Sequence, residues 1–351
     1  MIAPPVAEAL ASWAWMEAAR ILVPPPDARS AEAWAAWPAE ALLEAFTQAP
    51  PAAPEPPVGL ALELLRRPWR GTELELLRQR ADGLRRQLAG DTVTYVVNRN
   101  LNVSNHCVQH CGFCAFRRDP GEPGAYWLEL EDLQERARQA QQAGATELCL
   151  QGGLNPAARL EGSQLAYAER LLLALLEAAP GIHLHAFSPQ ELVFIAEQDA
   201  IGLDAVLERL QAAGLGSVPG TAAEVLSERV RRLLCPEKLS ARAWVAAVLQ
   251  IHRHGLASTS PLPAGHPEGP AARAAQQLTL VARHAAARER DLPGFSEFVL
   301  LPFVGEAAPA PLRSRVGRDQ PDREAMLRLT AQARLLLGAW IPAHQPSWVK
   351  L

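Results

Sequence analysis

The sequence predicts an α/β protein built as a (βα) barrel. Runs with helical spacing alternate with short stretches rich in β-branched residues along most of the chain. Several helical runs end at a glycine, as at Gly144, Gly214 and Gly255, where helices commonly stop. This many strand–helix units in one domain favour a parallel barrel with helices outside over an open sheet. Catalytic groups are then expected at the carboxyl ends of the strands.

The expected elements alternate in chain order after a first helical run over 60–88. A strand over 92–97 is β-branched and aromatic, and it marks the start of the main domain. A helix follows that ends at Gly144. The later strands are expected over 146–151, 182–187 and 295–303, and the later helices over 164–178, 203–213, 241–254 and 322–337.

The first 57 residues differ in composition from the rest. Residues 1–48 are rich in Ala and Trp and predict short helices, whereas 49–57 contain so many prolines that an extended spacer is expected. We therefore predict an N-terminal helical extension with a Pro-rich linker over 1–57 and a barrel domain over 58–351.

Composition excludes several classes of function. The chain has 351 residues, 49% of them hydrophobic and 21% charged, which is ordinary for a globular protein. A net charge of −4 gives no basic field, so no nucleic-acid partner is expected. The N-terminus lacks the pattern of a signal peptide, and no apolar run is long enough to span a membrane. We expect a cytoplasmic protein without a membrane partner.

Three of the five cysteines lie within eight positions, at Cys107, Cys111 and Cys114. A reducing compartment disfavours disulfides, so metal binding is the leading explanation. Three soft thiolates can bind three irons of a [4Fe-4S] cluster and leave the fourth iron open, whereas a structural zinc site needs four protein ligands. The alternatives are a zinc site completed by His106 or His110, or three unrelated thiols.

The other two cysteines have a different setting. Cys149 falls inside a predicted strand, and Cys235 precedes a proline at the end of a helical run. We expect both to be buried packing residues.

The cysteine spacing, with Phe113 just before the last cysteine, resembles the radical S-adenosylmethionine (SAM) superfamily. Further stretches narrow the resemblance to FO synthase subunit 2, over about residues 60–351. These stretches are Asn98–Asn100, Cys114–Arg118, Gln151–Pro156, His185–Pro189, Pro219–Glu224, Cys235–Leu239, Glu297–Phe303 and Ser347–Leu351.

This resemblance implies a radical SAM barrel of the TIM-like type with a [4Fe-4S] cluster and S-adenosyl-L-methionine as cofactors. In the family, a 5'-deoxyadenosyl radical takes hydrogen from L-tyrosine, and the 4-hydroxybenzyl unit joins 5-amino-6-(D-ribitylamino)uracil on the way to the deazaflavin FO. The implied partners are a one-electron donor and FO synthase subunit 1, because only one CxxxCxxC motif lies in this chain.

The resemblance also implies cofactor-binding residues. Gly152 and Gly153 end a predicted strand where a side chain would obstruct a ligand, so their backbone is expected to bind the SAM amino group. A plain strand-to-loop turn is the alternative. Pro156, Ser188 and Glu224 belong to the same expected set.

The expected catalytic residues are His185, Glu224 and His266. His183 and His185 alternate along a strand and therefore share one face, which indicates a site at the barrel mouth, although one such histidine is often part of a core. Glu224 follows a Pro-Gly turn. It is expected either to orient SAM ribose or substrate, or to be a carboxylate at a helix N-terminus, where the helix dipole favours negative charge.

Two departures from the family suggest a second interpretation. The stretch Pro261–Gly269 has Ala264 where the family usually has a tyrosine, and prolines flank it; the chain also stops at Leu351, where the family usually continues. We therefore expect a barrel incomplete at its C-terminal end. The alternatives are a cluster-binding homologue with impaired catalysis and an enzyme like the aminofutalosine synthase of menaquinone biosynthesis.

Overall fold

The computed structural model contains two compact units. The described residues are 36–47, 58–221, 223, 225–264, 269–302, 310, 323–338 and 340–346. One unit comprises Thr94–Ala223 and Arg232–Thr259, and we call it the cysteine unit because it contains all five cysteines. The other comprises Met1–Val93, Glu224–Arg231 and Ser260–Leu351, and we call it the helical unit.

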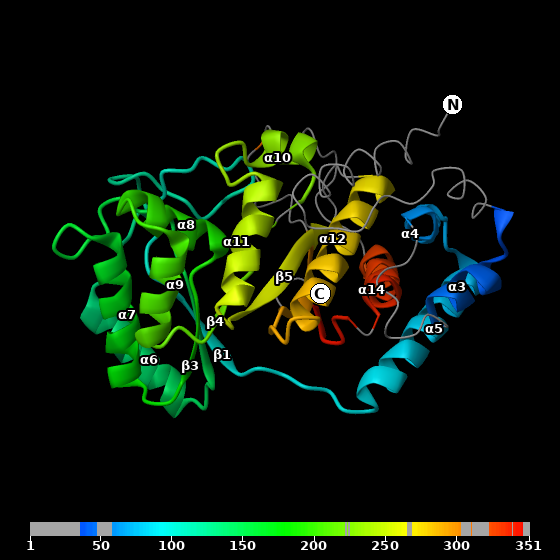
Figure 1. Ribbon diagram of the computed structural model, residues 1–351, viewed down its shortest axis with the longest axis horizontal. Coiled ribbons are helices and arrows are strands. Elements are labelled where there is room, and N and C mark those ends of the chain that lie inside the picture. Colours follow the sequence, from blue (N-terminus) through cyan, green and yellow to red (C-terminus); the bar gives the residue numbers. More distant parts are fainter. Residues whose placement is uncertain are drawn as a thin grey trace. The chain divides into compact units, whose positions relative to one another are not determined.

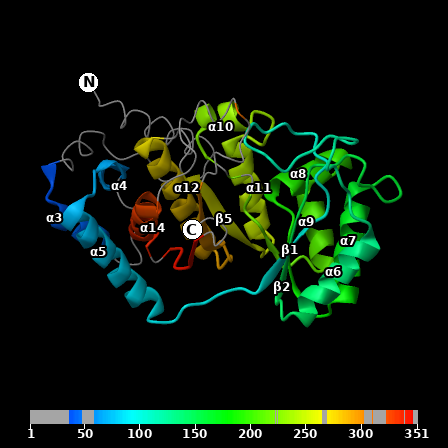
Figure 2. The same cartoon turned by 180° about the vertical axis from the view of Figure 1, so that it is seen from behind.

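The cysteine unit alternates strands and helices. Its strands β1 (Asn98–Asn102), β2 (Glu147–Gln151), β3 (His183–Ala186) and β4 (Ser217–Val218) are parallel neighbours, and β4 pairs with the start of β5 (Ala257–Ala264). Figures 1 and 2 show these strands beside the helices of the same unit. The helices are α6 (Leu130–Gln142), α7 (Gln164–Ala178), α8 (Pro189–Gln198), α9 (Leu203–Ala212) and α11 (Ala241–Arg253).

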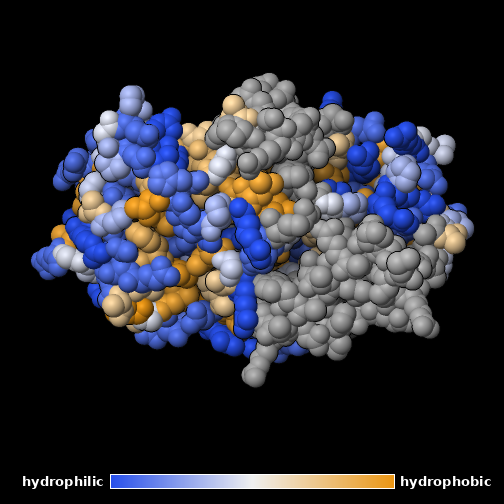
Figure 3. Space-filling view, turned by 90° about the horizontal axis from the view of Figure 1, so that it is seen from above, coloured by the Kyte–Doolittle hydropathy of each residue, from blue (hydrophilic) through white to orange (hydrophobic). Residues whose placement is uncertain are grey.

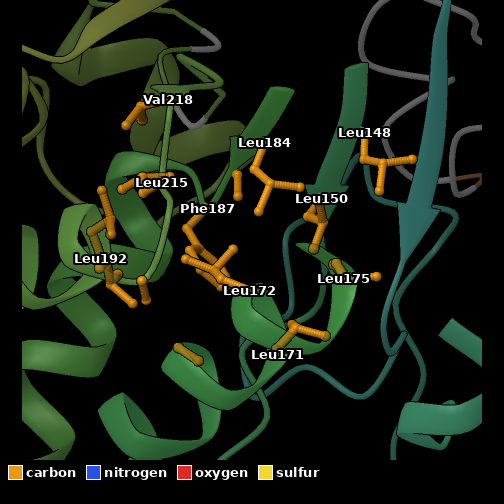
Figure 4. Close-up of a cluster of buried hydrophobic side chains, with 14 of the residues drawn as sticks. Leu148, Leu150, Leu171, Leu172, Leu175, Leu184, Phe187, Leu192, Leu215 and Val218 are labelled. Atoms are coloured by element: carbon orange, nitrogen blue, oxygen red, sulfur yellow. The ribbon is translucent and has the colours of Figure 1, made fainter. Parts of the chain in front are cut away.

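The two faces of this sheet differ in polarity. Leu148, Leu150 and Leu184 alternate along β2 and β3 and are fully buried in one core with leucines of α7 (Figure 4). Burying each leucine stabilises the fold by about 1.5–3 kcal/mol. Because successive side chains of a strand point to opposite faces, Glu147 and His183 project from the other face. The sheet therefore has an apolar helix-covered face and a polar face.

The helical unit has a core built from remote segments. Its helices are α3 (Ala39–Thr47), α4 (Val58–Arg66), α5 (Gly71–Ala89), α12 (Pro270–Arg288) and α14 (Arg323–Leu337); α10 (Glu228–Leu234) crosses the division between the units. Leu42, Leu64 and Leu335 are almost fully buried in one cluster. The indole of Trp69 and the amide of Gln332 both donate to the Leu64 carbonyl, at 2.8 and 2.7 Å. These two hydrogen bonds tie α14 and the segment before α5 to the end of α4.

The strands β6 (Phe295–Pro302) and β7 (His344–Pro346) continue the sheet, whose order is β1-β2-β3-β4-β5-β6-β7. The described pairs β1–β2, β2–β3, β3–β4, β4–β5 and β6–β7 are all parallel. Consecutive parallel strands joined through helices are the arrangement of a (βα) barrel. Within the described ranges β7 pairs with β6, and no strand follows it. The predicted fold class, an incomplete TIM-like barrel, is confirmed.

Two local expectations were wrong. Residues 92–97 form no strand, because Val93 and Tyr95 are over 80% exposed and the first pairing begins at Asn98. The helix expected over 60–88 is two helices, since Pro68 cannot continue α4. Pro261 and Pro263 lie in the last residues of β5 (Ala257–Ala264).

The helices and surface match an ordinary folded chain. Within the ranges that the structure describes, no helix is both long and apolar enough to cross a membrane. On the face drawn in Figure 3, hydrophilic residues cover much of the coloured surface, with smaller apolar areas between them.

Candidate functional site

The three clustered cysteines lie on a loop that follows β1 directly. Cys111 is buried, Cys107 and Cys114 are half-buried, and none forms a disulfide. The Cys114 N–H donates to the Cys111 carbonyl at 3.0 Å, so the last four residues of the motif form a tight turn. The three cysteines therefore lie together on one short segment.

Asn105 fixes the start of this loop. Its side chain donates to the Gly124 carbonyl at 2.9 Å and accepts from the Tyr126 N–H at 2.7 Å. The Ser104 hydroxyl donates to the Tyr126 carbonyl at 3.1 Å. Since both side chains are buried, these bonds hold the entry to the cysteine loop in one conformation.

A second segment of the same unit, Leu234–Lys238, holds the middle of the loop. The Gly112 N–H donates to the Leu234 carbonyl at 2.8 Å, and the His110 N–H donates to the Glu237 carboxylate at 2.6 Å. The Lys238 ammonium lies 5.6 Å from the centre of the Phe113 ring. The loop is thus anchored through its backbone at Gly112 and His110.

The Gly152–Gly153 loop packs against the cysteine loop. The Gly153 N–H donates to the Ser104 carbonyl at 2.8 Å. A Cβ atom on Gly153 would lie 2.1 Å from the His106 carbonyl oxygen and 2.8 Å from Cys107 Cβ. The glycine is needed because another backbone approaches it. From the sequence, we expected a bound ligand, and not another part of the backbone, to occupy the space beside Gly153.

Glu191 completes this arrangement, and sequence reasoning missed it. Its carboxylate accepts from the Gly152 N–H at 3.0 Å, and from the N–H and hydroxyl of Ser188 at 2.7 and 2.6 Å. Burial raises the pKa of Glu191, while these donors oppose the rise. The stretch Ser188-Pro189-Gln190-Glu191 is a capping box that begins α8, and this pattern could have revealed it.

These contacts limit what the glycine loop can offer to a ligand. The N–H groups of Gly152 and Gly153 already donate to Glu191 and Ser104. Carbonyl oxygens are the remaining backbone groups, and they suit an ammonium group such as the amino group of SAM.

The loop also borders a cavity. It is lined by Gly152, Gly153, Asn155, Phe187 and Glu191, with apolar side chains around them. The Asn155 Nδ2 atom is buried and has no hydrogen-bond partner among the described residues. Phe187 has a positive φ of 57°, a strained conformation for an aromatic residue. An orphaned amide and a strained residue are both typical of ligand-binding regions.

The remaining predicted cofactor residues have structural contacts. Ser188 is the N-cap of α8, and its hydroxyl accepts from the Glu191 N–H at 3.3 Å. The Pro156 carbonyl accepts from Arg159 and Gln164 at 3.1 Å each. Their expected roles toward SAM stay predictions. Glu224 and His266 lie outside the described residues.

The described hydrogen bond of His185 is made to Ser217, outside the glycine loop. His183 Nε2 and His185 Nδ1 each lie 2.7 Å from the Ser217 hydroxyl, so the two histidines share one face as expected. Burial lowers the pKa of His185 to about 4. Glu147 and His183 are the first residues of their strands, whereas the glycine loop follows the carboxyl end of β2. The described contacts of His185 thus lead toward the amino ends of the strands, and its catalytic role stays a prediction.

The other two cysteines differ from the cluster. Cys235 is buried, as expected. Cys149 is half-buried, and desolvation raises its pKa to about 12. A thiol that stays protonated is a poor metal ligand.

Comparisons with known proteins agree with this geometry. Residues 101–274 match the model of the radical SAM superfamily. A 5-amino-6-(D-ribitylamino)uracil–L-tyrosine 4-hydroxyphenyl transferase of Synechocystis sp. is 53% identical over 285 residues, 79% of this chain and 71% of the relative. The enzyme of the same name from Synechococcus elongatus is 54% identical over 272 residues, 77% and 70% of the two chains.

The chain belongs to this family of radical SAM transferases. Solved structures support the fold independently of sequence. Methylornithine synthase (PylB) matches with a TM-score of 0.61 at 16% identity, over 87% of this chain and 78% of its own. The [FeFe]-hydrogenase maturase HydG matches with a TM-score of 0.65 at 13% identity, over 89% and 64%. At such low identities these likenesses concern the fold alone.

Proposed function

We propose that this chain cleaves L-tyrosine and joins its 4-hydroxybenzyl unit to 5-amino-6-(D-ribitylamino)uracil, in the biosynthesis of the deazaflavin FO. The observation that carries the proposal is the cysteine loop packed against the glycine loop, in a chain about half identical to transferases of that name. The high sequence identity to these transferases favours this function over that of an aminofutalosine synthase.

Cys107, Cys111 and Cys114 would hold a [4Fe-4S] cluster. The three cysteines do not form a compact ligand group of the kind that holds a single ion. Among the described residues, ligand atoms of at least three side chains lie within 4.8 Å of one another in one group, and this group contains no cysteine. Thiolates that each bind a different iron need not approach as closely as the ligands of one ion. The donor set therefore fits a cluster better than a zinc ion.

S-adenosyl-L-methionine would bind beside the same loop. When bound, the two cofactors supply the one-electron chemistry of the superfamily. The carbonyl groups of Gly152 and Gly153 would accept from its ammonium group, and the free amide of Asn155 offers a further donor beside them. Glu191 would act as a positioning residue, because it fixes the Gly152 N–H and thereby the direction of the loop.

The protein's own part is to hold these groups and exclude water. The side chains of Asn105 and Glu237 hold the two halves of the cysteine loop through hydrogen bonds to backbone groups. The thiols would therefore keep their positions when the charge of the cluster changes. We further propose a cytoplasmic protein that receives electrons from a separate one-electron donor and passes its product to FO synthase subunit 1.

Anaerobic reconstitution tests the proposal. The reconstituted protein is incubated with SAM, a reductant, L-tyrosine and 5-amino-6-(D-ribitylamino)uracil, and 5'-deoxyadenosine and the coupled product are measured. We expect 5'-deoxyadenosine formation to depend on tyrosine and coupled product to need both substrates. Activity with the menaquinone precursor in place of tyrosine and the uracil would contradict the proposal.

A matched pair of variants completes this test. Cys114→Ser should abolish both products, whereas Cys149→Ser, which alters a thiol of the same unit outside the motif, should retain them. Loss of activity in both variants would show that the assay reports folding and not the cluster.

A further inference from the structure

We propose that Glu147, His183 and His185 form a binding site for a divalent transition-metal ion at the amino ends of β2 and β3, separate from the cysteine loop. One ligand atom from each side chain lies within 4.8 Å of the other two. No other trio of this kind occurs in the part of the chain that the structure describes. A bound ion would draw these atoms closer by a small side-chain adjustment.

The strand register brings the three side chains together. Glu147 is the Cα partner of His183 in the parallel pair of β2 and β3. His185 is two residues farther along β3 and so projects from the same face as His183. The grouping therefore follows from rigid backbone pairing and needs no loop to fold over the site.

Neighbouring groups hold the ligands in place. The Ser217 hydroxyl contacts one ring nitrogen of each histidine at 2.7 Å, and the Asn98 amide donates to Glu147 at 3.3 Å. A Cβ atom on Gly216 would lie 2.5 Å from the His183 ring, so only glycine leaves room for this ring position. Such outer contacts are typical partners of metal-ligating histidines and carboxylates.

The donor set selects the class of ion. Two imidazoles and one carboxylate suit Zn²⁺, Fe²⁺ or Co²⁺, whereas Ca²⁺ and Mg²⁺ prefer oxygen ligands alone. His183 is exposed and Glu147 is half-buried, so an ion can reach the site from solvent; His185 is buried and closes its inner side. Three protein ligands leave at least one position for water.

The location indicates a structural role for this ion. Through Glu147, the two histidines and their partners Asn98 and Ser217, the ion would connect the first residues of β1 to β4. In (βα) barrels this end of the strands serves stability, and chemistry takes place at the other end. Binding should therefore raise the unfolding temperature.

The test uses the full chain with its cysteines occupied by a reconstituted cluster, in metal-free buffer under anaerobic conditions. Zn²⁺ or Co²⁺ is added, unbound ion is removed, and bound metal is counted beside iron. We expect one equivalent of added ion per chain and a higher unfolding temperature. The Co²⁺ spectrum is recorded in the triple variant Cys107→Ser, Cys111→Ser and Cys114→Ser, where no cluster absorbs, and it should show the weak visible bands of nitrogen and oxygen ligands without thiolate charge-transfer absorption.

Variants decide which residues bind the ion. His183→Ala and Glu147→Gln should abolish the added equivalent, and Ser217→Ala should weaken binding about tenfold. His254→Gln is the matched control, because His254 pairs with Asp204 at 2.8 Å in the same unit, outside the site. Glu147→Gln preserves side-chain size, so it decides the question even where His183→Ala fails to fold.

Three results would overturn the proposal. They are the absence of a bound ion in the unaltered chain, undiminished binding by Glu147→Gln, and a thiolate spectrum for bound Co²⁺. The triple variant Cys107→Ser, Cys111→Ser and Cys114→Ser should bind the same single equivalent, because the site does not use the cysteine loop.

Discussion

The two units use helices and strands alike, but their cores are assembled in different ways. In the cysteine unit the core is formed by consecutive strand–helix pairs between Leu101 and Leu256. In the helical unit one core joins α3, α4 and α5 with α12 and α14, whose residues lie roughly 200 to 300 positions apart. Local sequence patterns therefore predict neighbours in the first unit and only element types in the second.

The largest effect should come from the cysteine unit. Cys111→Ala should abolish cluster binding, since a cluster left with two thiolates on this loop loses a buried ligand. Iron content and visible absorption after anaerobic reconstitution measure the result. Cys235→Ala alters another buried thiol and should retain iron; a cluster that survives in Cys111→Ala would show that the motif does not hold it.

The helical unit should respond most to a change in α3. Leu42 is fully buried against residues from α4 and α14, so Leu42→Ala should lower the free energy of unfolding by about 2–5 kcal/mol. Urea denaturation followed by circular dichroism measures this change. The exposed Glu44 on the same helix is the control, and Glu44→Ala should change stability little.

This variant also sharpens the predicted boundary at residue 57. A full effect of Leu42→Ala would mean that α3 acts as part of the helical unit, and deletion of 1–57 should then destabilise the chain. If both changes leave stability and iron binding intact, residues 1–57 are a separable extension, as the sequence predicts.

The effect of adding a single methyl group can be compared between the two units at Gly153 and Gly83. Gly153→Ala places a Cβ against the His106 carbonyl and should cost about 1–3 kcal/mol and reduce iron retention. Gly83→Ala lies in α5 with open space around it and should stabilise by up to about 1 kcal/mol. Thermal unfolding measures both, and equal effects would contradict the close packing of the two loops.

The helical unit should also show a pH dependence of its stability. His284 accepts from the Phe295 N–H at 3.0 Å, and burial lowers its pKa to about 4. A histidine with a lowered pKa binds fewer protons when folded than when unfolded, so stability falls as pH drops from about 6.5 to 4. The slope should not exceed about 1.4 kcal/mol per pH unit.

His284→Asn removes the titrating group and retains an acceptor near the position of Nδ1. Its unfolding free energy should therefore depend less on pH over that range than the unaltered chain's does. An unchanged slope would assign the acid sensitivity to other groups.

The sequence predicted much of the cysteine unit and its family. Helices α7, α9 and α11 agree with the expected ranges to within one residue at each end, because glycine or Pro-Gly stops mark their ends. The strand expected over 92–97 was wrong because β-branched composition says nothing about whether a neighbouring strand is present to pair.

The site was predictable to the extent that its residues form a motif. The cysteine spacing identified the loop, yet Glu191 was missed, since its role depends on two loops meeting at one carboxylate. The reason for Gly153 was also hidden, because the atoms that exclude a side chain belong to His106 and Cys107, far along the chain.

The contact between these two loops has a consequence for engineering and evolution. With the Gly153 backbone against that of His106, and the Val108 N–H donating to the Leu154 carbonyl at 3.0 Å, the two loops form one interlocked piece. An insertion in either loop would shift the other, so their lengths must be inherited together. A graft of the cysteine motif onto another barrel should therefore carry the glycine loop with it.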